Sequence, residues 1–170
     1  MIAILGGPSF RIGIGGGAAS SMQSGSSSEE LDFASVQRDN AEIERRCQEV
    51  INACTYLESN PIVSIHDIGA GGLCNAVPEI VNDSKMGARI SLDEVDVAEN
   101  NMSSLEIWCN ESQERYVLII SKEDYDNYKD ICKRENCPTY VIGNVTSKKH
   151  LVVSHHGNTS LSLIHISEPT

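Results

Sequence analysis

Asp67 is the first residue whose position in the sequence suggests chemistry. It follows an apolar run at residues 62–65, predicted to be a buried strand, and precedes the glycine-rich turn at residues 68–72. A carboxylate at the carboxyl end of a strand lies where open α/β sheets bind ligands, and it can hold Mg²⁺ that bridges to substrate phosphates. The spacing supports equally well a structural interpretation, in which Asp67 caps the turn and His66 is a half-buried histidine with satisfied hydrogen bonds.

A second glycine-rich segment, at residues 13–21, contains Gly15, Gly16 and Gly17 and ends in serines. Successive glycines allow several backbone N–H groups to point at one anion, and serine hydroxyls add donors. The segment matches neither G-x-x-x-x-G-K-[ST] nor G-x-G-x-x-G, so it contains no named nucleotide-binding motif. Phosphate binding and a flexible connector are both open interpretations.

A run of five hydrogen-bonding side chains precedes the apolar segment 116–120. Its members are Asn110, Glu111, Ser112, Gln113 and Glu114. Such a run can bind a polar ligand or form a solvated turn. The neighbouring Cys109 has no histidine on either flank, which favours a structural thiol over a nucleophile. His155 and His156 are a candidate metal site for which the sequence supplies no nearby cysteine or acidic partner.

The surrounding pattern predicts the elements that position these residues. A helix is expected over residues 39–59, because Asp39 or Asn40 can cap it and apolar side chains recur at three- and four-residue steps. Strands are expected at residues 2–5, 62–65, 88–92, 115–121, 140–145 and 151–154, the last two as a pair, and further helices through residue 80 and at 122–136. This irregular alternation indicates an α+β (mixed α/β) fold.

Composition narrows the class of protein. The chain has 170 residues, of which 40% are apolar, and 13 basic against 24 acidic residues give 13 − 24 = −11. This acidity argues against nucleic acid as a partner, and no apolar run is long enough to span a membrane. The beginning of the sequence lacks the features of a secretion signal, so we expect a cytoplasmic protein. Its six cysteines include no C-x-x-C pair, which favours reduced, structural thiols over zinc ribbons or disulfides.

The order of the segments is more specific than any one of them. Gly6-Gly7-Pro8 is followed by GIGGGAASSMQSG, LDFASVQRDNAEIERRCQEVI, IHDIGAGGLCNAVPEIV and MSSLEIWCNESQERYVL. These blocks resemble phosphoribosylformylglycinamidine synthase, and more closely the long single-chain form of that purine-biosynthesis enzyme. The resemblance extends over residues 5–153. It implies the C-terminal-type lobe of the aminoimidazole ribonucleotide synthetase-like fold.

The resemblance also implies an activity. In that family ATP phosphorylates the amide oxygen of formylglycinamide ribonucleotide, and ammonia released from glutamine displaces the phosphate to give an amidine. Asp67 matches the magnesium-binding acid of the motif D-x-G-A-x-G-[LI]. Glu111, Ser112 and Gln113 match a triplet that contacts the ribonucleotide, and Gln37 matches a further substrate-contacting glutamine.

The resemblance assigns a role only loosely to the glycine-rich segment and assigns none to His66. The glycines at 15, 16 and 17 would lie near a substrate phosphate, and His66 receives no catalytic role. The implied cofactors are Mg²⁺ and, as co-substrate, ATP, which is bound mainly by a domain that this sequence does not contain.

The length departs from the family, whose chains are many times longer. The sequence corresponds to the second lobe of the first synthetase repeat, so its expected partners are formylglycinamide ribonucleotide and the remaining synthetase and glutaminase domains. We expect the isolated chain to be inactive. Residues 1–34 are interpreted as a glycine- and serine-rich entry segment and residues 35–154 as the lobe. Residues 155–170 are interpreted as a non-family tail, of which the last part resembles translated adapter sequence, although a genuine final strand is the alternative.

Two other functions are alternatives to the enzyme fragment. A stand-alone, non-catalytic acidic domain that binds a small anion or a partner protein is compatible with the serine-rich segment 20–28 and with a single lobe. An enzyme similar to selenophosphate synthetase would need a reactive cysteine or selenocysteine near a glycine-rich N-terminus, and the sequence has none.

Overall fold

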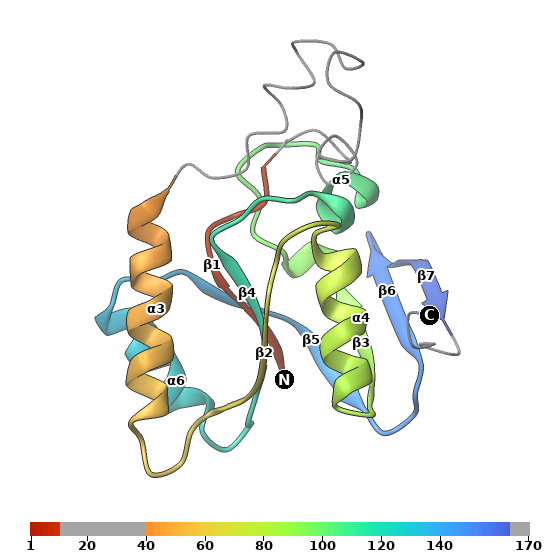
Figure 1. Cartoon of the computed structure of the whole chain (residues 1–170). Coiled ribbons are helices and arrows are strands. Elements are labelled where there is room, and N and C mark those ends of the chain that lie inside the picture. Colours follow the sequence, from red (N-terminus) through yellow and green to blue (C-terminus); the bar gives the residue numbers. More distant parts are fainter. Residues whose placement is uncertain (11–39, 164–170) are drawn as a thin grey trace, which may run out of the picture.

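The computed structural model describes residues 1–10 and 40–163, which build one mixed sheet (Figure 1). Its strand order is β2-β4-β1-β5-β3-β6-β7. All neighbours are antiparallel except β3 and β6, which are parallel. The strands are β1 (Ile2–Gly6), β2 (Ile62–Asp67), β3 (Gly87–Ser91), β4 (Arg115–Ile120), β5 (Thr139–Thr146), β6 (Leu151–His155) and β7 (Asn158–Leu163). The expected α+β class is confirmed.

Helices cover both faces of the sheet (Figure 1). α3 (Ala41–Thr55) and α6 (Tyr125–Arg134) pack on one face, whereas α4 (Leu73–Asp83) packs on the other. A one-turn 3-10 helix, η1 (Leu92–Glu94), and the short α5 (Ser104–Cys109) complete the α4 side. No helix of the described residues combines the length and the apolar character that crossing a membrane requires.

The central strand β1 belongs to two hydrophobic cores at once. Ile2 and Ile4 pack on the α4 side, and Ala3 and Leu5 pack on the side of α3 and α6. All four are fully buried, because side chains alternate between the faces of a strand and helices cover both faces here. A strand that is covered on both faces needs apolar side chains at every position, which accounts for the continuous apolar run of β1.

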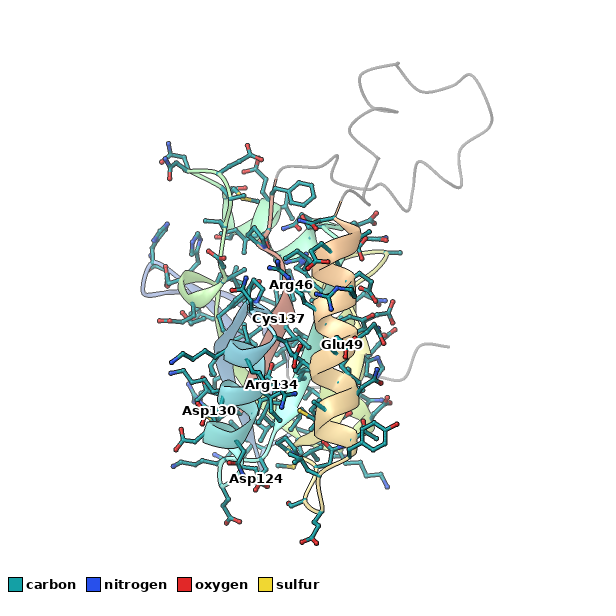
Figure 2. The ribbon with its side chains drawn as sticks, turned by 90° about the vertical axis from the view of Figure 1, so that its left-hand side faces the viewer. Arg46, Glu49, Asp124, Asp130, Arg134 and Cys137 are labelled. Carbon is teal, nitrogen blue, oxygen red and sulfur yellow. The ribbon has the colours of Figure 1, made fainter. Side chains whose placement is uncertain are left out.

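α3 begins where the capping pattern predicts. The Asn40 side chain accepts a hydrogen bond from the Ile43 backbone N–H at 3.1 Å, and two glutamates lie in the first turn. The buried face of the helix holds Cys47, Val50 and Cys54. Its outward face, seen beside α6 in Figure 2, presents charged side chains such as Arg46 and Glu49. The helix predicted over residues 39–59 is confirmed, although it ends four residues earlier.

α4 runs through Pro78 instead of beginning or ending there. Proline lacks the N–H that an interior position would donate, which makes such a position costly. Five buried apolar side chains hold the helix against the sheet and offset that cost: Leu73, Ala76, Val77, Ile80 and Val81.

Three features differ from the sequence-based expectations. β2 is not buried but forms an edge of the sheet, where Val63 is 66% exposed. The expected pairing of residues 140–145 with 151–154 is wrong, because β3 lies between β5 and β6 and pairs with both. α5 was not expected within a polar stretch. A capping box between Ser103 and Glu106 initiates it.

Candidate functional site

A cavity of about 570 Å³ opens where three segments meet. Its walls come from the end of β2 with the turn that follows, from the first turn of α3, and from the residues that lead into β4. Asp67 and Gln113, singled out separately in the sequence, both line it. Gln37 and the glycines at 15, 16 and 17 lie outside the described residues.

The lining of this cavity is acidic. Glu44, Asp67 and Glu114 contribute carboxylates, while the guanidinium of the adjacent Arg115 is turned into the protein interior. Glu44 accepts hydrogen bonds from the Tyr116 hydroxyl at 2.7 Å and the Gln48 amide at 2.9 Å. Burial and the contact with Glu44 raise the pKa of Tyr116, so this phenol stays a hydrogen-bond donor. A phosphorylated ligand needs a cation to enter such surroundings.

Asp67 offers a single exposed carboxylate to the cavity, so a Mg²⁺ ion there would need its other ligands from phosphate oxygens and water. Asp67 is exposed at the end of β2. Its Oδ2 lies beside Gly69, so that a Cβ added at Gly69 would be 3.5 Å from this oxygen. In the described part of the chain, Asp67 belongs to no group of three potential metal ligands. Mg²⁺ commonly takes only one or two carboxylates and completes its shell with phosphate oxygens and water. A single carboxylate on an open cavity suits that arrangement.

Two glycines bring three sequence motifs into backbone contact. Gly72, in the turn after β2, has φ +63°, and a Cβ there would overlap the carbonyl oxygen of Asn110. Gly6, at the end of β1, has φ +121°, and a Cβ there would overlap the carbonyl oxygen of Glu114. The polar run 110–114 is therefore held on both sides by positions that only glycine can occupy.

The members of the polar run have different surroundings. Glu111 is 2% exposed, and its Oε1 accepts a hydrogen bond from the Gly71 N–H at 2.9 Å. Ser112 is fully buried, and its Oγ accepts from the Phe10 N–H at 3.1 Å and donates to the Phe10 carbonyl at 3.2 Å. Of the triplet at 111–113, only Gln113 lines the cavity. Glu111 and Ser112 bind the backbone of the segments around it.

Arg115 is a structural centre that the sequence analysis did not identify. Its side chain is 1% exposed and donates to the Ser112 carbonyl at 2.7 Å, to the Ser9 hydroxyl at 2.6 Å and to Asn110 Oδ1 at 3.0 Å. Burial lowers the pKa of this guanidinium, and the nearby Tyr140 opposes that effect. The signal was available in the sequence, since a charged residue opens an otherwise apolar strand.

Neither the cysteines nor His66 supplies a nucleophile to this cavity. Burial raises the pKa of Cys74 to about 11, and its thiol donates to the Gly71 carbonyl at 2.7 Å. All six cysteines are free, as expected. His66 points toward α4, where its ring nitrogens lie 3.5 Å from Glu79 and 3.1 Å from Asp83.

Comparison with known proteins gives one family match and several similar folds. The family model described as "AIR synthase related protein, C-terminal domain" matches residues 2–156. A phosphoribosylformylglycinamidine synthase II structure from Thermotoga maritima superposes with TM-score 0.77 at 23% identity, covering 95% of this chain and 24% of that protein.

Two further structures of the T. maritima protein, PurL, were obtained as complexes. The complex with FGAR has TM-score 0.78 at 24% identity and covers 95% of this chain and 26% of the relative. The complex with ATP has TM-score 0.69 at 24% identity and covers 95% and 24%. At these identities the likeness establishes the fold, and the chain spans about a quarter of each relative.

Proposed function

Since this chain belongs to the family of C-terminal domains of AIR synthase related proteins, we propose that it is part of a phosphoribosylformylglycinamidine synthase. The complete enzyme would convert formylglycinamide ribonucleotide, glutamine and ATP to formylglycinamidine ribonucleotide. The observation that carries this proposal is the meeting of Asp67 and Gln113 on one acidic cavity, built from segments whose order resembles that family. The ligand named in one relative, FGAR, is the substrate expected here.

In this proposal each described residue has a limited task. Asp67 would hold Mg²⁺, which when bound supplies the positive charge that lets phosphate oxygens approach the carboxylates of the cavity. Gln113, on the cavity wall, offers an amide that both donates and accepts hydrogen bonds to the ribonucleotide. Glu111 and Ser112 would act through the backbone that they hold in place.

The chain by itself supplies only part of the machinery. Positioning and charge neutralisation dominate phosphoryl transfer, so the partners that bring ATP and ammonia to the amide must complete the site. We therefore propose that the isolated chain binds the ribonucleotide but does not turn it over. The single-chain form of the parent enzyme and the glutaminase as ammonia source are parts of this proposal.

The test uses the full-length parent enzyme with Asp67→Asn. This substitution removes the charge but keeps the shape, so synthetase turnover should fall about a hundred- to a thousandfold, the range seen when one electrostatic contact to the reacting group is lost. Glutamine hydrolysis, measured separately, should stay detectable. Normal synthetase turnover in this variant would refute the assignment of Asp67.

Gln113→Ala gives a second, independent measurement. Loss of its amide should raise the KM for the ribonucleotide about tenfold and leave the KM for ATP nearly unchanged. Glu123→Gln, on the exposed segment before α6, is the matched control and should alter neither. An unchanged ribonucleotide KM in Gln113→Ala would refute the assignment of Gln113 as a substrate contact.

A further inference from the structure

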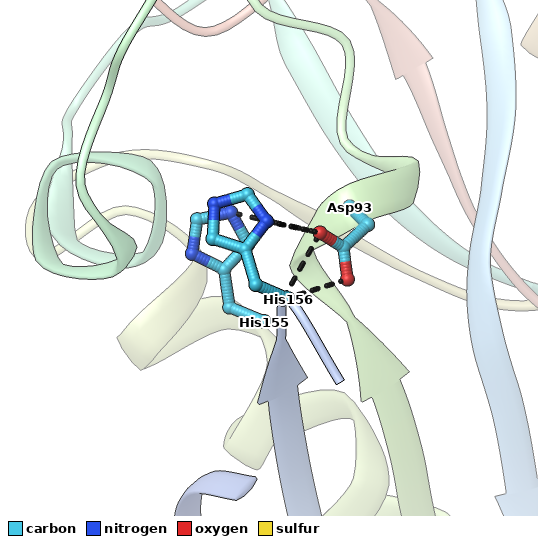
Figure 3. Close-up of side chains that lie close together, drawn as sticks. All are labelled: Asp93, His155 and His156. Carbon is cyan, nitrogen blue, oxygen red and sulfur yellow. Dashed lines mark hydrogen bonds and ion pairs between the residues drawn. The ribbon is translucent and has the colours of Figure 1, made fainter. Parts of the chain in front are cut away.

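A cluster of Asp93, His155 and His156 lies at the end of β6, next to the edge strand β7 (Figure 3). The parallel pairing of β3 with β6 sets Ser91 opposite Ser154, so the residues that follow the two strands come together. Asp93 lies in η1, 63 residues before His156. The expectation that the histidine pair lacks an acidic partner is therefore wrong, because the partner comes from a distant segment.

The turn after β6 places both imidazoles on one side. Neighbouring residues of a strand point to opposite faces, but His156 has φ +50° and Gly157 has φ +73° in the two-residue loop before β7. The rings of His155 and His156 consequently stack, with centroids 3.8 Å apart and planes inclined by 25°. Each then presents a nitrogen to Asp93 Oδ1: His156 Nδ1 at 3.3 Å and His155 Nε2 at 3.8 Å (Figure 3).

Hydrogen bonds from the surrounding chain fix the orientation of two of these groups. His155 is 8% exposed, and its Nδ1 lies 2.7 Å from the Ser104 hydroxyl on α5. His155 can bind a metal ion through Nε2 in the tautomer whose Nδ1 carries the proton and donates it to Ser104, because the Nε2 lone pair then faces the same space as the Asp93 carboxylate. Both oxygens of Asp93 accept from the His156 backbone N–H at 3.1 Å.

We propose that Asp93, His155 and His156 bind one divalent transition-metal ion, with Zn²⁺ as the best match, and leave its fourth position to water. Two imidazoles and one carboxylate form a donor set that suits Zn²⁺ and not Mg²⁺. Ligand atoms about 2.0–2.2 Å from a tetrahedral zinc ion lie roughly 3.3–3.6 Å from one another. The three ligand atoms here all lie within 4.8 Å of one another, and the exposed His156 must turn out of its stack on His155 to direct the Nδ1 lone pair at the same ion.

The ion would add a link between segments that are far apart in the sequence. It bridges the β6–β7 loop to η1 and, through Ser104, reaches α5, which leads directly to the polar run 110–114. The site goes beyond the proposed ligase function and shares no residue with the cavity. Both histidines lie within residues 2–156, the span matched by the family model.

The chain offers a matched control in His66. This histidine also has two acidic neighbours, but Glu79 lies at one ring nitrogen and Asp83 at the other. Since the two nitrogens of an imidazole point in different directions, one ion cannot use all three groups. If negative charge alone attracted the metal ion, replacing His66 and replacing His156 would weaken Zn²⁺ binding equally.

The test is isothermal titration of the whole chain with Zn²⁺ alone, with circular dichroism to verify folding of each variant. We expect one ion per chain in the unmodified protein and in His66→Ala. His156→Ala and Asp93→Asn should each weaken binding at least about a hundredfold, and Ser104→Ala, which removes only an orienting contact, about tenfold. Excess Mg²⁺ should not compete.

Several results would overturn the site. These are a lack of saturable Zn²⁺ binding, unchanged affinity in both His156→Ala and Asp93→Asn, or an equal loss in His66→Ala. Loss of binding after alkylation of the cysteines, with the histidines intact, would assign the zinc to the thiols instead.

Discussion

The acidic cavity and the histidine cluster are built in opposite ways. Around the cavity, backbone approaches backbone at Gly6 and Gly72, and buried polar side chains fill the space that is left. At the histidine cluster, backbone pairing brings strand ends together, and every contact includes a side chain, either between two side chains or from the His156 N–H to the Asp93 carboxylate. The cavity should therefore tolerate almost no change of shape, whereas the cluster should lose its chemistry without losing its fold.

Replacing the turn glycines tests this contrast with the largest expected effect. Gly72→Ala forces a Cβ into the Asn110 carbonyl at a positive φ, so we expect the free energy of unfolding to fall by about 3 kcal/mol or more. Gly157→Ala, at φ +73° in the β6–β7 loop, meets nothing within 4 Å and should lose only about 1 kcal/mol. Urea unfolding measures both, and equal losses would contradict the contrast.

Removing the buried cation tests the polar network at the cavity. Arg115→Met leaves the acceptors of Ser112 and Asn110 buried without their donor, so we expect a loss of about 2–3 kcal/mol in unfolding free energy. Arg45→Met is the control, because Arg45 pairs with Glu42 on the surface of α3 and should leave stability nearly unchanged. An unchanged free energy of unfolding in Arg115→Met would mean that apolar packing can replace the hydrogen bonds of Arg115.

The smallest expected effect is a decline of stability in alkali that originates beside the cavity. Burial raises the pKa of Cys74 from 9.0 to about 11, so the folded state holds this proton more tightly than the unfolded chain does. The corresponding stabilisation is complete below pH 9 and is lost as the pH rises toward 11. Cys74→Ala should flatten this part of the profile in urea unfolding, whereas His156→Ala should leave it unchanged. If the pH dependence of the unfolding free energy is the same in Cys74→Ala as in the unmodified protein, other groups cause the decline.

The same contrast explains what the sequence could and could not predict. The central strand, the capped helix α3 and the helix α6 follow from local patterns, since each carries its own periodicity and end signals. Asp67 was singled out by the glycine-rich turn that follows its strand, and Gln113 by the polar run before β4 and its resemblance to a family triplet; both line the cavity. Their roles as metal and substrate ligands are still predictions.

What could not be predicted depends on pairing between distant segments. The insertion of β3 between β5 and β6, and with it the meeting of Asp93 with the two histidines, leaves no mark in any one segment. The exposure of β2 likewise depends on its place at the sheet edge, because its local pattern of Ile62, Val63 and Ile65 resembles that of a central strand. α5 was missed although Ser103 and Glu106 carry a capping signature.

The central place of β1 bears on how the chain folds during synthesis. Ile2 pairs with Ile119 and Ile4 with Tyr140, so β1 is synthesised well before either of the strands that flank it in the sheet. β1 keeps two unpaired edges until residues 115–120 are made and one unpaired edge until residues 139–146 are made, and such long-range pairing folds slowly. Chaperone binding and aggregation therefore compete with folding over most of the time that this domain takes to be translated.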